Sequence, residues 1–248
     1  YRPVAEIMFG DFVTLAVEQI CNQAAKTFYI SGGRISCPLV LRTRTGGGFR
    51  AGCHHSQSVE SYFTNIPGLK VVFPSTPYDL IGLLKSAVRD DNPVVFLEHK
   101  SMLGMKGTVP DEEYLVPLGK ADVKREGADV TIVTYGKMVH TSLSAAEELA
   151  KEGISAEVID LRTLVPLDKD TVLESVRKTG RAAVVYEGVK FSGFGAELSA
   201  MIAEEAIHVL DAPIRRFATA FSPIPVGDSE DYLYTNEQEI VQGIREMF

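Results

Sequence analysis

The chain of 248 residues has no tryptophan and only three cysteines, Cys21, Cys37 and Cys53. These cysteines form no CxxC pair and lack the spacing of a zinc site. Sparse, unpaired cysteines are typical of proteins that stay reduced in the cytosol. The sequence therefore predicts a cytoplasmic protein without a disulfide framework. Cys53 adjoins His54, but a packed thiol remains the simpler interpretation of it.

Long apolar runs and an excess of basic residues are also missing. No run approaches the roughly 20 apolar residues that a membrane-spanning helix needs, and no signal-peptide pattern opens the chain. Lysine and arginine number 25 against 33 acidic residues, which gives a net charge of −8. Nucleic-acid binding normally begins with a basic surface, and an acidic membrane repels a chain of this charge. The composition thus predicts that the protein binds neither nucleic acid nor membranes.

Short apolar runs alternate with helical patterns throughout the sequence. One helical pattern follows Asp11, which is placed as its N-cap, and another begins at Thr76, with Pro77 as first helical residue. Strands rich in Val, Ile and Leu that are separated by helices favour an α/β fold with mostly parallel sheets flanked by helices. The apolar stripe of the first helix is Val13, Val17, Ile20, Ala24 and Phe28. The predicted strands are Val4–Phe9, Leu39–Arg42, Lys70–Phe73, Val94–Leu97, Val130–Tyr135, Ala156–Asp160, Ala182–Glu187 and Ile214–Phe217.

Residues 104–127 interrupt this alternation with glycines, prolines and the acidic run Asp111-Glu112-Glu113. Such a composition is typical of a linker. We therefore expect two α/β domains, 1–105 and 125–248, that are joined by a linker over 106–124.

The segment between Thr45 and Ser58 concentrates chemistry in a few residues. Gly46-Gly47-Gly48 is followed by His54, His55, Ser56 and Gln57. Glycines allow close backbone approach, and histidine readily exchanges protons near neutral pH. In open α/β sheets ligands lie beyond the carboxyl ends of strands, and Phe9–Phe12 follows another predicted strand end. We expect the two strand-end segments to face one crevice that contains a reaction centre.

Several motifs in one order carry a specific resemblance over essentially the whole chain. They resemble the β subunit of the thiamine diphosphate-dependent 2-oxo acid dehydrogenases, which include pyruvate, branched-chain and acetoin enzymes. The motifs are Glu6-Ile7-Met8-Phe9-Gly10-Asp11-Phe12, Ser31-Gly32-Gly33, Leu41-Arg42-Thr43, His55-Ser56-Gln57-Ser58, Pro67-Gly68-Leu69-Lys70-Val71-Val72, Pro74-Ser75-Thr76-Pro77, Asp90-Asp91-Asn92-Pro93, Phe96-Leu97-Glu98, Asp160-Leu161-Arg162-Thr163-Leu164-Val165-Pro166-Leu167-Asp168 and Gly193-Phe194-Gly195-Ala196-Glu197.

The resemblance implies a pyrimidine-binding domain followed by a transketolase C-terminal-like domain. It also implies an α subunit partner in an α2β2 heterotetramer, with thiamine diphosphate shared at the interface. In the family the α subunit holds the diphosphate and Mg²⁺ through a Gly-Asp-Gly…Asn motif. Gly10-Asp11-Phe12 and Gly227-Asp228-Ser229 lack the second glycine of that motif. The chain therefore resembles half of a site.

The resemblance also implies roles for single residues. Phe12 matches the residue that lies against the cofactor's aminopyrimidine ring, although a core position at a helix start is the alternative. Met8 lies in the cofactor-binding segment, where branched-chain enzymes typically have glutamine, so it favours a pyruvate or acetoin enzyme. His55 matches the catalytic histidine that binds the substrate carboxylate and assists acyl transfer to lipoamide. His54 has no matching role, and Ser56 and Gln57 are expected to fix the loop.

Asp90 and Asn92 match a position where the family often binds a structural K⁺, for which oxygen ligands are suitable. A turn at a helix end is an equally good interpretation. In the family, a glutamate upstream of the segment that matches Arg2-Pro3 activates the cofactor, and Glu6 does not replace it. The chain begins without an initiator methionine. We therefore expect the N-terminal part of the first domain to be missing from this sequence.

The sequence thus predicts an enzyme subunit, active only with its α subunit, of a pyruvate or acetoin dehydrogenase. A lipoyl acyltransferase core component is the implied further partner, and its docking would involve the C-terminal domain. Three alternatives stay open: a branched-chain β subunit, a sugar-phosphate enzyme of the transketolase superfamily, and a non-catalytic tethering subunit. Arg162, Asp168, Glu187 and Glu197 match family positions and are interpreted as interface and fold residues.

Overall fold

The computed structural model describes residues 1–248, which form two compact units. The first unit contains residues 1–120, 162–167 and 224–230, and the second contains 121–161, 168–223 and 231–248. Two short segments from beyond the predicted 106–124 linker therefore complete the first unit. Within that linker, Val116 is buried in the core of the first unit.

The first unit is built on a five-stranded sheet in the order β1-β2-β4-β3-β8. Its first four strands pair in parallel, and β8 pairs antiparallel with β3. The predicted parallel strands are confirmed, with ends that shift by one to three residues. The bounds are β1 Val4–Ile7, β2 Val40–Thr45, β3 Lys70–Val72, β4 Val94–His99 and β8 Thr163–Val165.

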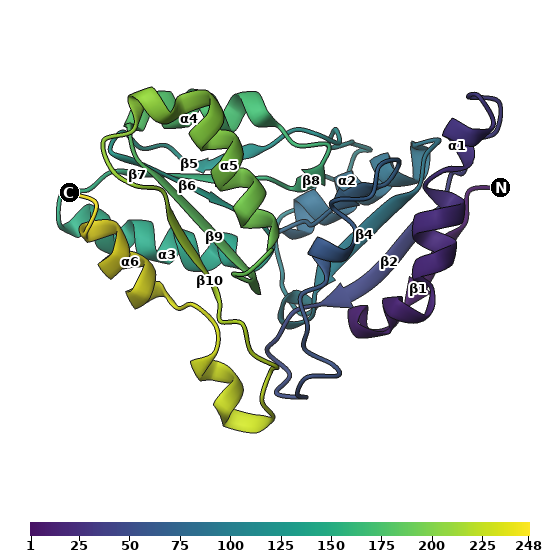
Figure 1. Cartoon of the computed structure of the whole chain (residues 1–248), viewed down its shortest axis with the longest axis horizontal. Helices are drawn as coiled ribbons and strands as arrows, with labels where there is room; N and C mark the ends of the chain where they lie inside the picture. Colours follow the sequence, from purple (N-terminus) through teal and green to yellow (C-terminus); the bar gives the residue numbers. More distant parts are fainter. The chain divides into compact units, whose positions relative to one another are not determined.

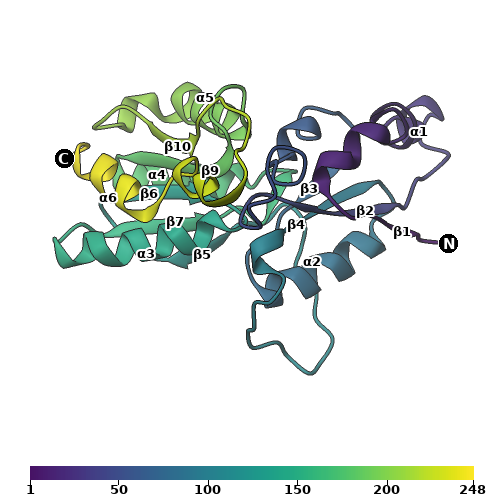
Figure 2. The same cartoon turned by 90° about the horizontal axis from the view of Figure 1, so that it is seen from below.

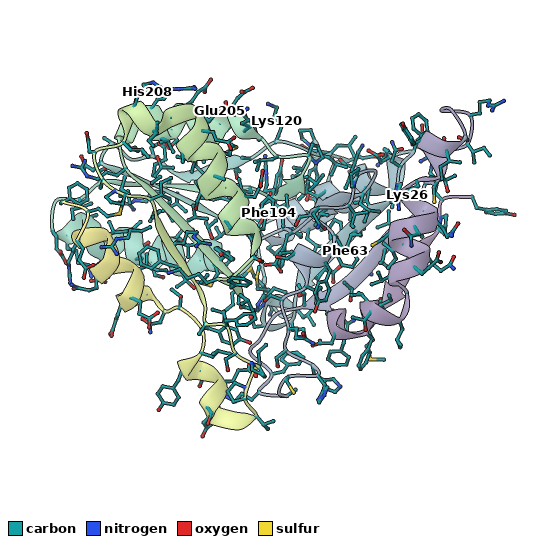
Figure 3. All side chains as sticks on the ribbon, in the orientation of Figure 1. Lys26, Phe63, Lys120, Phe194, Glu205 and His208 are labelled. Carbon is teal, nitrogen blue, oxygen red and sulfur yellow. The ribbon has the colours of Figure 1, made fainter.

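Helices lie on both faces of this sheet, as Figure 2 shows for α2 on one face and the N-terminal helical segment on the other. Helix α2 spans Pro77–Arg89, and the side chain of Thr76 accepts a hydrogen bond from the Asp79 amide. The predicted cap and first helical residue are therefore confirmed. The buried core between α2 and the sheet contains Val40, Val72, Leu83, Ala87, Val94, Phe96 and Val116. Phe63, on the first unit, is also fully buried (Figure 3).

The N-terminal helical segment differs from the single helix that the apolar stripe predicts. It consists of a 3₁₀ helix, Gly10–Leu15, a π-helical segment, Glu18–Ala24, and the short α1, Thr27–Ile30. The prediction that Asp11 caps this helix is wrong, because the N-cap position is Phe9 and Asp11 lies inside the 3₁₀ helix. The Asp11 carboxylate instead accepts hydrogen bonds from the amide and side chain of Gln57.

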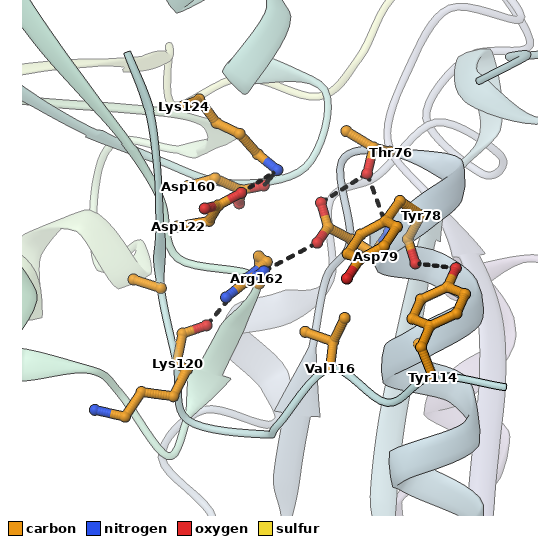
Figure 4. A network of polar contacts seen from close by, with 12 residues as sticks. Thr76, Tyr78, Asp79, Tyr114, Val116, Lys120, Asp122, Lys124, Asp160 and Arg162 are labelled. Carbon is orange, nitrogen blue, oxygen red and sulfur yellow. Dashed lines mark hydrogen bonds and ion pairs between the residues drawn. The ribbon is translucent and has the colours of Figure 1, made fainter. Parts of the chain in front are cut away.

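Strand β8 is held in the first sheet by the residue that precedes it. Arg162 has a φ of 56°, its carbonyl accepts a hydrogen bond from the Phe73 amide, and its guanidinium pairs with Asp79 at 3.1 Å. The guanidinium also donates to the Lys120 carbonyl (Figure 4). Asp79 is fully buried. The interpretation of Arg162 as a fold residue agrees with these contacts.

The second unit contains a five-stranded sheet in the order β10-β9-β6-β7-β5, parallel except for β5. Helices α3 and α6 cover one face, and α4 and α5 cover the other (Figure 1). Asp168 caps α4 through its side chain. Phe194 begins α5 and is buried (Figure 3). The strands are β5 Asp122–Arg125, β6 Val130–Thr134, β7 Ala156–Asp160, β9 Ala182–Val189 and β10 Arg215–Thr219. The helices are α3 Met138–Lys151, α4 Lys169–Thr179, α5 Phe194–Ala206 and α6 Glu237–Arg245.

The remaining regular elements are short 3₁₀ turns in the connections. They are Glu60–Tyr62, Lys100–Met102, Ile207–Val209 and Gly227–Tyr232. None of the helices combines the length and the apolar character that crossing a membrane requires.

Candidate active site

Three neighbouring strands of the first sheet end together and position the candidate site. Strands β1, β2 and β4 are adjacent and parallel, so the segments that follow them begin at the same edge of the sheet. These segments are Met8–Phe12 after β1, residues 46–58 after β2 and His99–Ser101 after β4. This is the strand-end position at which open α/β sheets bind ligands.

An aromatic cluster joins the first two segments. The ring centroids of Phe9 and His55 lie 4.9 Å apart at an interplanar angle of 88°, and those of Phe12 and His55 lie 5.5 Å apart at 79°. The Phe9 and Phe12 rings also meet edge to face, at 5.8 Å. Edge-to-face contacts of this kind fix the plane of a ring beyond what burial alone achieves. The structure thus brings Phe12 and His55 together, as the strand-end argument predicts.

Apolar side chains of the segment after β1 are open to solvent. Phe12 is 41% exposed and Met8 is 60% exposed, whereas His55 is half-buried. Phe12 is therefore not a core residue at a helix start. Exposed apolar side chains beside an imidazole suit the binding of a flat heterocycle, because stacking would cover them.

The glycine-rich loop is held in place by buried polar contacts. Glu230, which is fully buried, accepts hydrogen bonds from the Gly48 amide at 2.5 Å and the Ser56 hydroxyl at 3.1 Å. Gly48 has a φ of 99°, which only glycine adopts without strain. The amide of Gly46 donates to the Gln57 carbonyl at 2.9 Å. The expectation that Ser56 and Gln57 fix the loop agrees with these contacts.

Two charged residues lie beneath His55. The ammonium of Lys100, fully buried, donates a hydrogen bond to the His55 carbonyl and lies 3.8 Å from Asp11 Oδ2. Asp11 Oδ1 accepts from the Gln57 amide at 3.1 Å and from Gln57 Nε2 at 3.0 Å. Sequence reasoning missed Lys100 and Glu230, because neither lies in a motif and both reach the loop from distant positions in the chain.

The remaining histidine and cysteine of the loop lie to one side of it. His54 is exposed, and its Nδ1 lies 3.5 Å from Cys53 Sγ. Next to the site, a pocket of about 230 Å³ is lined mainly by apolar side chains of α2 and of the segment after β4. Its lining includes His99, whose Nδ1 lies 2.8 Å from the Ser101 hydroxyl, but not Phe12 or His55.

Asp90 and Asn92 form a turn at the end of α2. Asp90 Oδ2 accepts a hydrogen bond from the Lys70 ammonium, and Oδ1 accepts from the Asn92 amide at 2.9 Å. The Asp90 carbonyl accepts from Arg2 at 2.7 Å. The Asp90 carboxylate is thus already paired with a side-chain ammonium, and its match to a K⁺ position stays a prediction. No group of three or more His, Cys, Asp or Glu side chains is arranged to hold a metal ion.

Two family models match the chain, and the boundary between them lies close to the boundary between the two units. Residues 1–106 match the transketolase pyrimidine-binding domain, and residues 119–240 match the transketolase C-terminal domain. Among solved structures, a split-gene transketolase described as an inactive β4 tetramer superposes with a TM-score of 0.80 at 24% identity, covering 99% of this chain and 75% of that one. At this identity the likeness concerns the fold alone.

Similarity to characterised sequences is much higher. The 2-oxoisovalerate dehydrogenase subunit beta of Bacillus subtilis is 49% identical over 99% of this chain and 76% of its own length. The subunit beta of acetoin:2,6-dichlorophenolindophenol oxidoreductase from Cupriavidus necator is 51% identical over 94% of this chain and 69% of its own length. The pyruvate dehydrogenase E1 component subunit beta of B. subtilis is 48% identical over 100% of this chain and 76% of its own length. The chain therefore belongs to the family of β subunits of the thiamine diphosphate-dependent 2-oxo acid and acetoin dehydrogenases.

Proposed function

We propose that this chain is the β subunit of a cytoplasmic α2β2 pyruvate or acetoin dehydrogenase that passes an acyl group to lipoamide. The observation that carries the proposal is the cluster of Phe9, Phe12 and His55, which meets at the carboxyl ends of β1 and β2. It combines a half-buried imidazole with exposed apolar surface at the edge of the sheet where ligands bind. The β-subunit names of relatives that are 48–51% identical support an α subunit as partner.

Met8 and Phe12 are the residues that would hold the cofactor. Both side chains are apolar and exposed, and Phe12 contacts His55, so they fit the aminopyrimidine ring of thiamine diphosphate. When bound, thiamine diphosphate supplies the carbanion chemistry that cleaves the bond beside a 2-oxo carbonyl. This chain lacks a Gly-Asp-Gly motif, so we assign the Mg²⁺ and the diphosphate to the α subunit.

His55 would bind the substrate and manage its protons. As an imidazolium it pairs with the substrate carboxylate, and as a neutral ring it accepts a proton during acyl transfer to lipoamide. Phe9 and Phe12 contact the ring edge to face and orient it for both tasks. Lipoamide arrives on the acyltransferase core component, which we propose as the second partner.

The identity of residue 8 favours pyruvate or acetoin as substrate, because methionine there resembles enzymes for small substrates. A branched-chain 2-oxo acid is the second candidate, since the 2-oxoisovalerate relative is 49% identical over 99% of this chain. Turnover of each substrate by one preparation distinguishes the candidates.

The test is the complex of this chain with its α subunit, assayed for lipoamide-dependent turnover of pyruvate, acetoin and 3-methyl-2-oxobutanoate. Replacing His55 with Gln should lower kcat by about 100-fold or more, the range expected for loss of a proton-transfer group. His140→Gln, in the second unit, is the matched control and should leave kcat unchanged. Full turnover by the His55→Gln complex would refute the role of His55. Absence of turnover with every substrate would favour the non-catalytic subunit.

Phe12→Ala separates cofactor binding from proton transfer. Loss of a stacking face should raise the thiamine diphosphate concentration needed for half-maximal activity by about fivefold, because such a contact contributes about 1 kcal/mol. Saturating cofactor should then restore most of kcat. An unchanged cofactor requirement would contradict the placement of the pyrimidine ring against Phe12.

A further inference from the structure

We propose that Lys100 is a positioning residue for His55, and that it acts with Asp11 as a buried clamp on residues 55–57. This inference rests on the proposed function, since it takes His55 as the group whose placement matters. The clamp consists of one ion pair whose two members hold opposite ends of a three-residue peptide. It is built from residues that follow three different strands, β1, β2 and β4.

Both members of the ion pair are buried. The side chain of Lys100 is 0% exposed and that of Asp11 is 3% exposed. A buried ammonium loses its hydration, and this loss is tolerated when the charge is both paired and hydrogen-bonded. Lys100 meets both conditions, through Asp11 Oδ2 at 3.8 Å and through the carbonyl of His55. An apolar side chain would fill this core position without the desolvation cost of an ammonium, which indicates that the hydrogen bond from Lys100 to the His55 carbonyl is what the position requires.

The two charges bind different groups of the segment 55–57. The ammonium binds the carbonyl of His55, whereas Asp11 Oδ1 binds both the amide and the side chain of Gln57. One end of the peptide is held by a cation and the other by an anion. Because the charges also attract each other, a shift of either end would weaken the whole arrangement.

Lys100 also affects the imidazole ring of His55 through Phe9. The Lys100 ammonium lies 5.5 Å from the centroid of the Phe9 ring, and the Phe9 ring meets the His55 ring edge to face at 4.9 Å. A cation over a ring face attracts that ring, so Lys100 also fixes Phe9. Lys100 therefore sets the His55 backbone directly and the His55 ring through Phe9.

The decisive variant removes both charges while it keeps the volume. In Lys100→Met/Asp11→Asn no uncompensated charge is left in the core, and the amide oxygen at position 11 still accepts from Gln57. Lys100→Arg is the conservative partner, since it keeps a cation opposite Asp11 and a donor for the His55 carbonyl. Both variants are assayed in the complex with the α subunit.

Two measurements report on the position of His55 in these variants. The first is the rate at which diethylpyrocarbonate modifies His55, measured by mass spectrometry with His140 as internal standard. The second is kcat in the lipoamide-dependent assay. In the double variant the His55 rate should rise severalfold, and kcat should fall by about tenfold or more, because a displacement near 1 Å can cost about 100-fold. Lys100→Arg should retain kcat within about threefold of the wild type.

The two proposals fail in different ways. Unchanged His55 modification and a kcat within twofold in the double variant would overturn the clamp, whatever His55 does. Equal losses in Lys100→Arg, which keeps both charges, and in the double variant, which removes them, would also overturn it, because the effect would then not follow the ion pair. Full activity of His55→Gln would overturn the proposed function, whereas the modification rate of His55 in the double variant would still test the clamp.

Discussion

Replacement of Glu230 by alanine should loosen the glycine-rich loop and destabilise the first unit. The carboxylate is 0% exposed and accepts hydrogen bonds from the Gly48 amide and the Ser56 hydroxyl. A hydrogen bond to a charged group contributes about 1.5–3 kcal/mol, so two such bonds set an upper range of about 3–6 kcal/mol. Gly48 is exposed, so water can reach its freed amide, which favours the lower end, about 3 kcal/mol. For a chain of this size that loss lowers the melting temperature by roughly 6–12 °C.

Glu230→Gln should cost less, because its amide oxygen still accepts from Gly48 while its amide nitrogen donates to the Ser56 hydroxyl. The matched control is Asp228→Ala, which removes an exposed carboxylate from the same segment. Asp228 pairs with Arg50 at 2.5 Å, with side-chain exposures of 88% and 49%, and such surface pairs contribute at most about 1 kcal/mol.

The assay combines thermal melting with amide hydrogen exchange of peptides that cover residues 46–58. Glu230→Ala should increase exchange there and lower the melting temperature, and Asp228→Ala should change neither appreciably. If Glu230→Ala melts and exchanges like the control, the buried carboxylate does not hold the loop, and the reasoning from burial and hydrogen bonding is wrong.

Two further predictions concern the second unit. Gly195→Ala should destabilise the second unit by about 2 kcal/mol despite the higher helix propensity of alanine, because the new Cβ would lie 2.0 Å from a ring carbon of the fully buried Tyr186. The control is Ala200→Gly at an exposed position of the same helix, which should cost about 1 kcal/mol from helix propensity alone. A thermal melt in which Gly195→Ala is the more stable of the two variants would contradict the clash. Burial acts to raise the pKa of Glu157, but hydrogen bonds, chiefly from Lys178, outweigh it and hold that pKa below its usual 4.5. The resulting stabilisation is complete above pH 4.5 and is lost as the pH falls through the folded-state pKa, so urea unfolding across the acid range should show a shallower pH dependence in Glu157→Gln than in the wild type.

Much of the sheet architecture follows from sequence pattern alone. Strands β4 and β6 are predominantly apolar and buried at every residue, as burial on both faces of a parallel sheet requires, whereas β1 lies at an edge of its sheet and is largely exposed. Strands β5 and β8 escaped prediction, because both are short antiparallel edge strands. Strand β8, in which Val165 pairs with Val71, has only three residues, and so short a segment shows no hydrophobic pattern that would identify it as a strand.

Part of the candidate site can likewise be predicted from the sequence, and part cannot. The proximity of Phe12 and His55 follows from the strand-end rule, because parallel neighbours end at one edge. The distorted helix after β1 does not follow from the apolar stripe, which records only which residues face the core. Its course depends on Asp11, whose carboxylate binds Gln57 across the site. Contacts of Lys100 and Glu230 with the loop likewise depend on tertiary placement, which local spacing does not encode.

Strand β8 comes late in the sequence, far from the other strands of its sheet, and this affects both the synthesis of the chain and its division into domains. Until Thr163–Val165 has been synthesised, β3 has one open edge, and the sheet that carries the candidate site is incomplete. An open edge presents unpaired amides and carbonyls to any other strand, including that of a second nascent chain. Cutting the gene within residues 106–120 would make this state permanent. The apparent N-terminal domain is therefore not an independent module: expressed alone it should aggregate, whereas a version extended by a tethered copy of residues 162–167 should regain a closed edge.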